Sequence, residues 1–198
     1  MRPLRHGGSR RPRGARGDGV TRDVAQRAAY ASLSVAIFGL DQWTKHLVTA
    51  SMTLHDSVPV IRDLFHLTLV TNRGALFGVL HDLADPYRSM LFTLVPILAV
   101  GLIVYFQVRT TLQDGIAHLG LALILGGALG NLADRLRFGH VIDFLDVFVG
   151  DHHWPAFNVA DSSICVGVSL LVFGLFLQGR RSSGSQSPIS AGHASDPL

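Results

Sequence analysis

Aspartate supplies every acidic side chain of this 198-residue chain: all fourteen acidic residues are Asp, and Glu does not occur. Two carboxyl groups that share a site cannot both ionise easily, so they hold one proton between them. One carboxylate then acts as a base toward water while the other acts as an acid toward a carbonyl oxygen. This chemistry needs no metal and no cofactor. The candidates are Asp134, Asp143, Asp146, Asp151 and Asp161.

Local context separates these candidates only in part. Asp134 precedes Arg135, which favours a structural ion pair, and Asp151 stands in a hydrophilic loop. Asp143 lies within the apolar stretch VIDFL, where burial is expected to favour the protonated form. Asp161 begins an apolar run, where a helix N-terminus would stabilise its anion. An acid in apolar surroundings beside an acid held as an anion suits acid–base catalysis, but the residues alone leave other pairings open.

Other reactive side chains give weaker signals. Cys165 is the only cysteine, so no disulfide can form within the chain, and its apolar run predicts a packing role. His152 and His153 beside Asp151 could bind a metal. However, adjacent histidines in a helix or strand point in different directions, and no HExxH pattern occurs. We therefore expect no metal site and no Ser or Cys nucleophile.

Four apolar runs must position these residues: 28–52, 89–108, 115–133 and 162–179. A helix needs about 20 mostly apolar residues to cross the hydrocarbon core. The first run reaches that length only if Asp41 and Lys45 are counted inside it. Its alternative interpretation is a cleavable signal peptide, which would not need this ion pair before its cleavage site. We expect an all-α integral membrane fold of four transmembrane helices with a small extracytoplasmic β-sheet.

Basic residues predict the orientation. Eight Arg stand within the first 27 positions, Arg109 lies between the second and third runs, and Arg180 follows the fourth. Because basic residues favour the cytoplasmic side, both termini are expected there. We predict a disordered Arg-rich tail over 1–27, a four-helix membrane domain over 28–180 and a disordered tail over 181–198. Since the basic residues have no interleaved aromatics, a nucleic-acid partner is not expected.

The first outer segment contains two short patterns typical of strands, at 58–61 and 65–70, followed by a turn at 71–74. With both termini inside, Asn131 and Asp134 end the third helix at the outer face, where Asn158 and Asp161 begin the fourth. Ionisable groups in a membrane are costly and point to function. A relay for proton or cation transport through Asp41, Lys45 and Asp134 is a rival, but such relays lie near the membrane midplane.

Five motifs in order resemble those of the lipoprotein signal peptidases, the type II signal peptidases. They are DQWTK at 41–45, NRGALFG at 72–78, GGALGNLADR at 126–135, GHVIDF at 139–144 and FNVADS at 157–162. Together they cover most of residues 28–180. Arg73 departs from the family pattern, where a small residue is frequent. A lipid-headgroup transferase is a further rival, because residues 139–143 match one half-motif, but the DGxxAR half is absent.

The resemblance implies a catalytic pair, Asp143 and Asp161, and a membrane aspartyl endopeptidase without a cofactor. Its substrate would be a diacylglyceryl-modified prolipoprotein, cut on the N-terminal side of the lipidated cysteine. It also implies a monomer among membrane lipids in a bacterial inner membrane, with its active site on the extracytoplasmic face. Residues expected to bind substrate or to support the site are Asn72, Gly74, Asn131, Asp134, Arg135, Asn158, Asp41 and Lys45.

Overall fold

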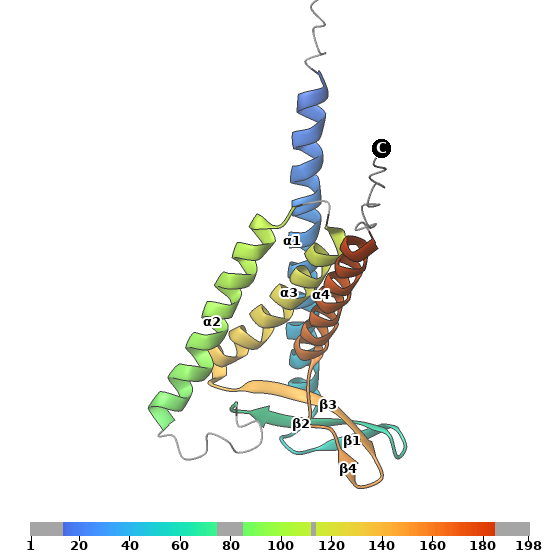
Figure 1. Ribbon diagram of the computed structural model, residues 1–198. Helices are drawn as coiled ribbons and strands as arrows, with labels where there is room; N and C mark the ends of the chain where they lie inside the picture. Colours follow the sequence, from blue (N-terminus) through green and yellow to red (C-terminus); the bar gives the residue numbers. More distant parts are fainter. Residues whose placement is uncertain (1–13, 75–84, 112–113, 185–198) are drawn as a thin grey trace, which may run out of the picture.

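A computed structural model describes residues 14–74, 85–111 and 114–184 of the chain (Figure 1). Within these residues the chain forms four helices and one four-stranded antiparallel sheet. The elements follow in the order α1 (Gly14–Ser51), β1 (Ser57–Ile61), β2 (Phe65–Asn72), α2 (Asp85–Arg109), α3 (Gly115–Phe138), β3 (Val141–Val149), β4 (His152–His153) and α4 (Val159–Gly184).

Helix α3 lies at the centre and contacts the other three helices. Its glycines allow two of them to approach closely. A Cβ on Gly126 would lie 2.7 Å from the Ser34 carbonyl oxygen of α1, and a Cβ on Gly127 would lie 2.5 Å from Ser163 Oγ of α4. Small residues at helix contacts are typical of membrane bundles. Glycine at these two positions therefore allows α1 and α4 to lie close against α3.

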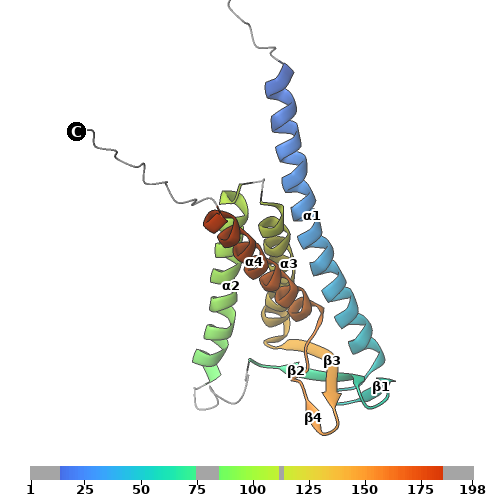
Figure 2. The ribbon, with the colours of Figure 1, turned by 45° about the vertical axis from the view of Figure 1, so that its right-hand side comes forward.

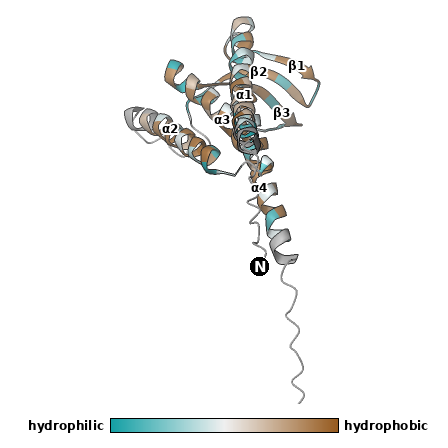
Figure 3. Cartoon of the chain, turned by 90° about the horizontal axis from the view of Figure 1, so that it is seen from above, coloured by the Kyte–Doolittle hydropathy of each residue, from teal (hydrophilic) through white to brown (hydrophobic). Residues whose placement is uncertain are grey.

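Three of the described helices are long and apolar enough to cross a membrane: Met90–Arg109, Gly115–Phe138 and Val159–Arg180. Helix α2 contacts α3 and exposes large apolar side chains such as Leu98 and Val108. Seen from above, hydrophobic residues cover much of α2 and parts of the sheet (Figure 3). The chain is therefore an integral membrane protein with a mostly helical fold.

The sheet lies across one end of the helices, while α1 begins and α4 ends at the other end (Figures 1 and 2). Strand β1 is an edge strand, where Pro59 is tolerated. Strand β2 pairs with β3 so that Val70 stands opposite Asp143. Leu69 and Phe144 pack with Val48 of α1 in a small core, which fixes the sheet against the helix end.

Two helix ends differ from the boundaries that the sequence predicted. Residues 14–27 were expected to form a disordered tail but belong to α1. This part of α1 contacts α2, because Arg27 Nη1 donates to the carbonyl oxygens of Gln107 (3.2 Å) and Val108 (3.3 Å). Helix α4 continues to Gly184, past the predicted boundary at 181. The parts of the two predicted tails at 1–13 and 185–198, and motif residues 75–78, lie outside the described residues.

Strand β3 was not predicted as a strand. Its nine residues, VIDFLDVFV, are rich in β-branched and aromatic side chains and end at Gly150, which is a recognisable strand signal. The strand is buried in its first half, so its apolar residues do not simply alternate with polar ones. The two strands that were predicted, at 58–61 and 65–70, are confirmed within β1 and β2.

Candidate active site

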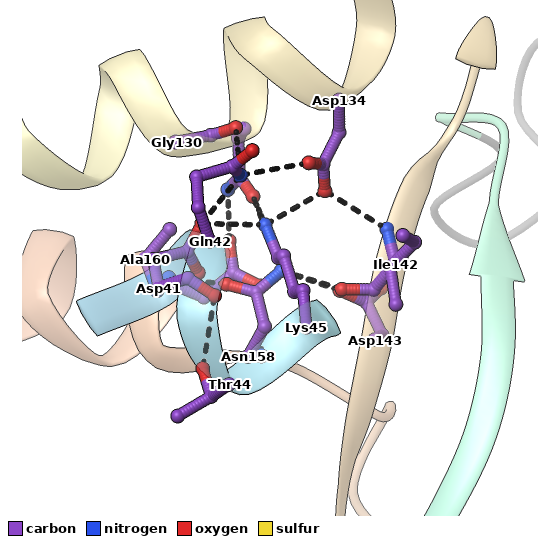
Figure 4. A network of polar contacts seen from close by, with 12 residues as sticks. Asp41, Gln42, Thr44, Lys45, Gly130, Asp134, Ile142, Asp143, Asn158 and Ala160 are labelled. Atoms are coloured by element: carbon purple, nitrogen blue, oxygen red, sulfur yellow. Dashed lines mark hydrogen bonds and ion pairs between the residues drawn. The ribbon is translucent and has the colours of Figure 1, made fainter. Parts of the chain in front are cut away.

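The polar residues expected at one face do meet at the sheet end of the helices. Helices α1 and α3, strand β3 and the start of α4 each contribute side chains (Figure 4). Asp143 is the third residue of β3, and Asp161 lies in the first turn of α4. Strand β3 and helix α4 thus bring two aspartates to the same site, although they are eighteen positions apart in sequence.

Asn158 and Asp161 cap the start of α4 reciprocally. The backbone N–H of Asp161 donates to Asn158 Oδ1 at 2.9 Å, and the backbone N–H of Asn158 donates to Asp161 Oδ2 at 3.2 Å. This exchange is a capping box, in which two residues three apart satisfy each other's free N–H groups at a helix start. The carboxyl group of Asp161 is therefore held at a fixed place on its own helix.

Amide side chains connect the two aspartates. Asn158 Nδ2 donates to Asp143 Oδ1 at 2.7 Å and to Asn131 Oδ1 at 3.1 Å. Asn131 Nδ2 in turn donates to Asp161 Oδ1 at 2.7 Å. The side chain of Asn72, the last residue of β2, also bonds the Asp143 carboxyl. Three of the asparagines expected from the motifs are thus direct partners of the acids.

Asp143 is a buried carboxyl that binds its proton more strongly than a free aspartate does. It is only 1% exposed. Burial and the nearby charge of Asp161 raise the pKa of Asp143 to about 6, against the opposing effect of bonds from Asn72 and Asn158 and the charge of Lys45. A carboxyl with this pKa, next to a second carboxyl, can share one proton with it.

A buried ion triad lies beside the aspartates. Lys45 Nζ stands 2.8 Å from Asp41 Oδ2 and 2.8 Å from Asp134 Oδ2, and it donates to Asn131 Oδ1 at 3.1 Å. Lys45 is 2% exposed, and the two carboxylates are buried. Asp134 therefore pairs with Lys45, whereas the sequence had suggested Arg135 as its partner.

Arg135 and Gly74 occupy the border of the site. Arg135 Nη1 donates to the Asn131 carbonyl oxygen at 3.3 Å, and its guanidinium interacts electrostatically with Asp161 and Asp143. Gly74 has a φ of +84°, and a Cβ there would lie 2.6 Å from the Phe92 ring of α2. Only glycine fits such a position, which explains the residue type in the NRG motif.

The remaining acidic candidates lie elsewhere. Asp146 Oδ1 accepts a hydrogen bond from His153 Nδ1 at 2.9 Å near the sheet edge, and Asp151 is exposed in the turn after β3. Cys165, expected to pack inside the protein, is exposed on α4. Asp143 and Asp161 thus share a network of asparagine contacts that Asp146 and Asp151 do not enter, a distinction that could be drawn only in part from the sequence.

One residue of the site was missed. Gln42 Nε2 donates to Asp134 Oδ1 at 2.9 Å, and Gln42 Oε1 accepts from Arg137 Nη1 at 3.0 Å. Neighbouring residues on a helix point to different faces, so its place next to Asp41 gave no reason to expect it in the same network. Only its position inside the DQWTK motif could have indicated that Gln42 belongs to the site.

Two carboxyl groups linked by amide side chains, with Asp143 deeply buried, are an arrangement that aspartic proteases use, and here it lies at the end of apolar helices. Comparison with known proteins gives the same class. The model of the family described as signal peptidase (SPase) II matches residues 33–177.

The lipoprotein signal peptidase of Syntrophus aciditrophicus (strain SB) is 45% identical over 144 residues, which are 73% of this chain and 89% of the relative. That of Geobacter sulfurreducens is 46% identical over 158 residues, 78% of this chain and 98% of the relative. A solved bacterial membrane enzyme, obtained by the in meso method, superposes with a TM-score of 0.67 at 31% identity, over 75% of this chain and 92% of that chain. The chain therefore belongs to the signal peptidase II family and is an aspartic-type protease.

Proposed function

We propose that Asp143 and Asp161 are the catalytic dyad of this signal peptidase II. Removal of signal peptides from prolipoproteins is the activity of the family to which the chain belongs. The observation that carries the dyad assignment is the Asn158 amide, which binds the Asp143 carboxyl at 2.7 Å while its own oxygen caps the Asp161 N–H at 2.9 Å. One side chain thereby holds both acids in place.

In the active form of the dyad the two acids share one proton, which we assign to Asp143, whose pKa is raised to about 6 by burial, and we assign the role of base to Asp161 at the N-terminus of α4. Asp161 removes a proton from water, and the water oxygen bonds to the scissile carbonyl carbon. Asp143 gives its proton to the carbonyl oxygen, which forms a neutral tetrahedral diol. The dyad again holds one proton after this step.

Collapse of the diol completes the reaction. The proton now on Asp161 passes to the leaving amide nitrogen, the C–N bond breaks, and a diol hydroxyl returns its proton to Asp143. The products are the carboxyl end of the signal peptide and the free amine of the next residue. Arg135, within electrostatic reach of both acids, would bind the carbonyl side of the substrate.

The second part of the proposal concerns the membrane. Helix α1 would be a fourth span, since its 38 residues extend about 57 Å at ~1.5 Å per residue. The two charged residues within its apolar stretch, Asp41 and Lys45, are buried against α3, whereas the exposed positions include the apolar Val35 and Leu47. A helix of this kind presents apolar side chains to lipid and its ion pair to protein.

Both termini would then be cytoplasmic, because α2 ends opposite the sheet (Figure 1), with Arg109 in its last turn and Arg27 bonded to the carbonyl oxygens of Gln107 and Val108 there. The dyad and the sheet would face the extracytoplasmic side of the bacterial inner membrane, and the protein would act as a monomer. A diacylglyceryl group could remain in lipid between the helices while the scissile bond reaches the dyad. We therefore propose cleavage on the N-terminal side of a diacylglyceryl-modified cysteine.

The substrate proposal is tested with purified protein and two forms of one precursor peptide, with and without the diacylglyceryl group on cysteine. We expect cleavage of the lipidated form only, with a product that begins at the lipidated cysteine by mass spectrometry. Equal cleavage of both forms, or a cut at another bond, would overturn this part of the proposal and leave the family assignment unaffected.

A further inference from the structure

We propose that the Asp41–Lys45–Asp134 triad is a positioning clamp that holds the backbone directly before each dyad aspartate and so sets the separation of their carboxyl groups. The proposal rests on the dyad assignment made above. In this proposal none of the three side chains contacts the substrate. They act through Ile142 and Ala160, which Figure 4 shows beside the triad and which directly precede Asp143 and Asp161.

The first arm of the clamp reaches β3. Asp134 Oδ2, which is ion-paired with Lys45, also accepts the backbone N–H of Ile142 at 3.2 Å. Ile142 directly precedes Asp143, and all three residues are buried. A movement of the Asp134 carboxylate would therefore move the backbone from which the Asp143 side chain extends.

The second arm reaches α4 in the same manner. Asp41 Oδ1 accepts the backbone N–H of Ala160 at 2.9 Å, while its Oδ2 pairs with Lys45. Ala160 directly precedes Asp161, and its N–H is one of those at a helix start that have no partner within the helix. A side chain of α1 thus supplies the acceptor that anchors the first turn of α4.

Lys45 joins the two arms. Its Nζ lies 2.8 Å from one oxygen of each carboxylate, and its remaining donor binds Asn131 Oδ1 at 3.1 Å. All three donors of the ammonium group are therefore used. Asn131 Nδ2 then binds Asp161, which orients that amide with its oxygen toward Lys45. One buried cation thus fixes both backbone anchors and one amide of the dyad.

The energetics fit a geometric role. A buried ion pair seldom stabilises a fold more than apolar side chains of similar volume would. Here each carboxylate is paired with Lys45 and also accepts a backbone N–H. The ion pairs balance the buried charge, and the N–H bonds fix the orientation of each carboxylate. Misplacement of reacting groups by about 1 Å can slow an enzyme about 100-fold.

The test compares leucine and asparagine at each anchor in the full-length protein, with lipidated precursor as substrate. Asp134→Leu and Asp41→Leu remove the acceptor of Ile142 N–H and Ala160 N–H. We expect kcat to fall about 100-fold while KM changes less than about 3-fold. Asp134→Asn and Asp41→Asn keep an oxygen for that N–H, so they should recover a substantial part of kcat.

Ser34→Ala is the matched control for a structural effect. Ser34 is buried between α1 and α3, where its Oγ donates to the Ala122 carbonyl oxygen at 2.9 Å, away from the dyad. The Ser34→Ala variant should have a lower Tm, and its kcat should equal that of the wild type at temperatures below that Tm. If the leucine variants at 41 and 134 behave like this control, the clamp is refuted.

Two further outcomes are decisive. If the leucine variants do not accumulate as folded protein, Asp134→Ala and Asp41→Ala, which also remove the acceptor of the backbone N–H, decide, and wild-type kcat in both would refute the clamp. Asp143→Asn and Asp161→Asn are measured in parallel. Activity in these variants would overturn the dyad itself, whereas their inactivity together with full kcat in the leucine variants would overturn the clamp alone.

Discussion

Removal of the buried Lys45 ammonium should destabilise the protein strongly. Lys45→Met keeps an unbranched side chain of similar length but leaves Asp41 and Asp134 buried without their common cation. The ammonium makes two ion pairs at 2.8 Å and one bond to Asn131 at 3.1 Å. Removal of one partner of a buried ion pair costs about 3–5 kcal/mol, so we expect the free energy of unfolding to fall by that amount.

Thermal unfolding of the detergent-purified protein measures this loss. About 3–5 kcal/mol corresponds to a decrease in Tm of roughly 6–20 °C for a chain of this size. The charge-neutral variant Asp41→Asn/Lys45→Met/Asp134→Asn should regain a large part of the loss, because no unpaired charge then remains buried. A Lys45→Met protein with a Tm within about 2 °C of the wild type would refute the reasoning about the triad.

Three further predictions concern the pH profile, helix packing and metals. The alkaline limb of kcat/KM should lie near pH 6, where Asp143 loses its proton, and Asn72→Leu should move that limb to higher pH because it removes a bond that favours the ionised carboxyl. Gly127→Ala should lower the free energy of unfolding by about 1–3 kcal/mol, since the new Cβ would lie 2.5 Å from Ser163 Oγ, whereas Gly39→Ala, with open space around it, should not destabilise the protein. A chelator should leave the cleavage rate unchanged, because a carboxyl dyad activates water by itself; inhibition by the chelator would revive the metal interpretation of His152 and His153.

Much of the fold could be predicted because lipid imposes a simple rule on helices. The apolar runs at 89–108, 115–133 and 162–179 became α2, α3 and α4, since a spanning segment must satisfy its backbone internally and present apolar side chains. Helix ends were less predictable. Helix α3 continues beyond its apolar run to Phe138 because Gly139 adopts a left-handed conformation that ends the helix there.

The candidate site was predictable in its residue types but not in its connections. Apolar surroundings pointed to Asp143, and the helix start pointed to Asp161. The bond from Asn158 to Asp143 depends on the antiparallel bridge between Leu145 of β3 and Phe157, which brings Asp143 to the start of α4, and β3 itself was not predicted. The ion pair of Asp134 with Lys45 could not be predicted either, because the two residues are far apart in sequence and only the tertiary fold brings them together.

Turnover of a diacylglyceryl-modified precursor by purified Asp143→Asn and Asp161→Asn is the most direct test of the central claim. Each isosteric change removes one ionisable group, and loss of a general acid or base lowers the rate about 100- to 10,000-fold. We predict at least that loss in both variants, with folded protein in the membrane, and near wild-type turnover for Asp151→Asn in the exposed turn. Near-normal turnover in either dyad variant would contradict the account.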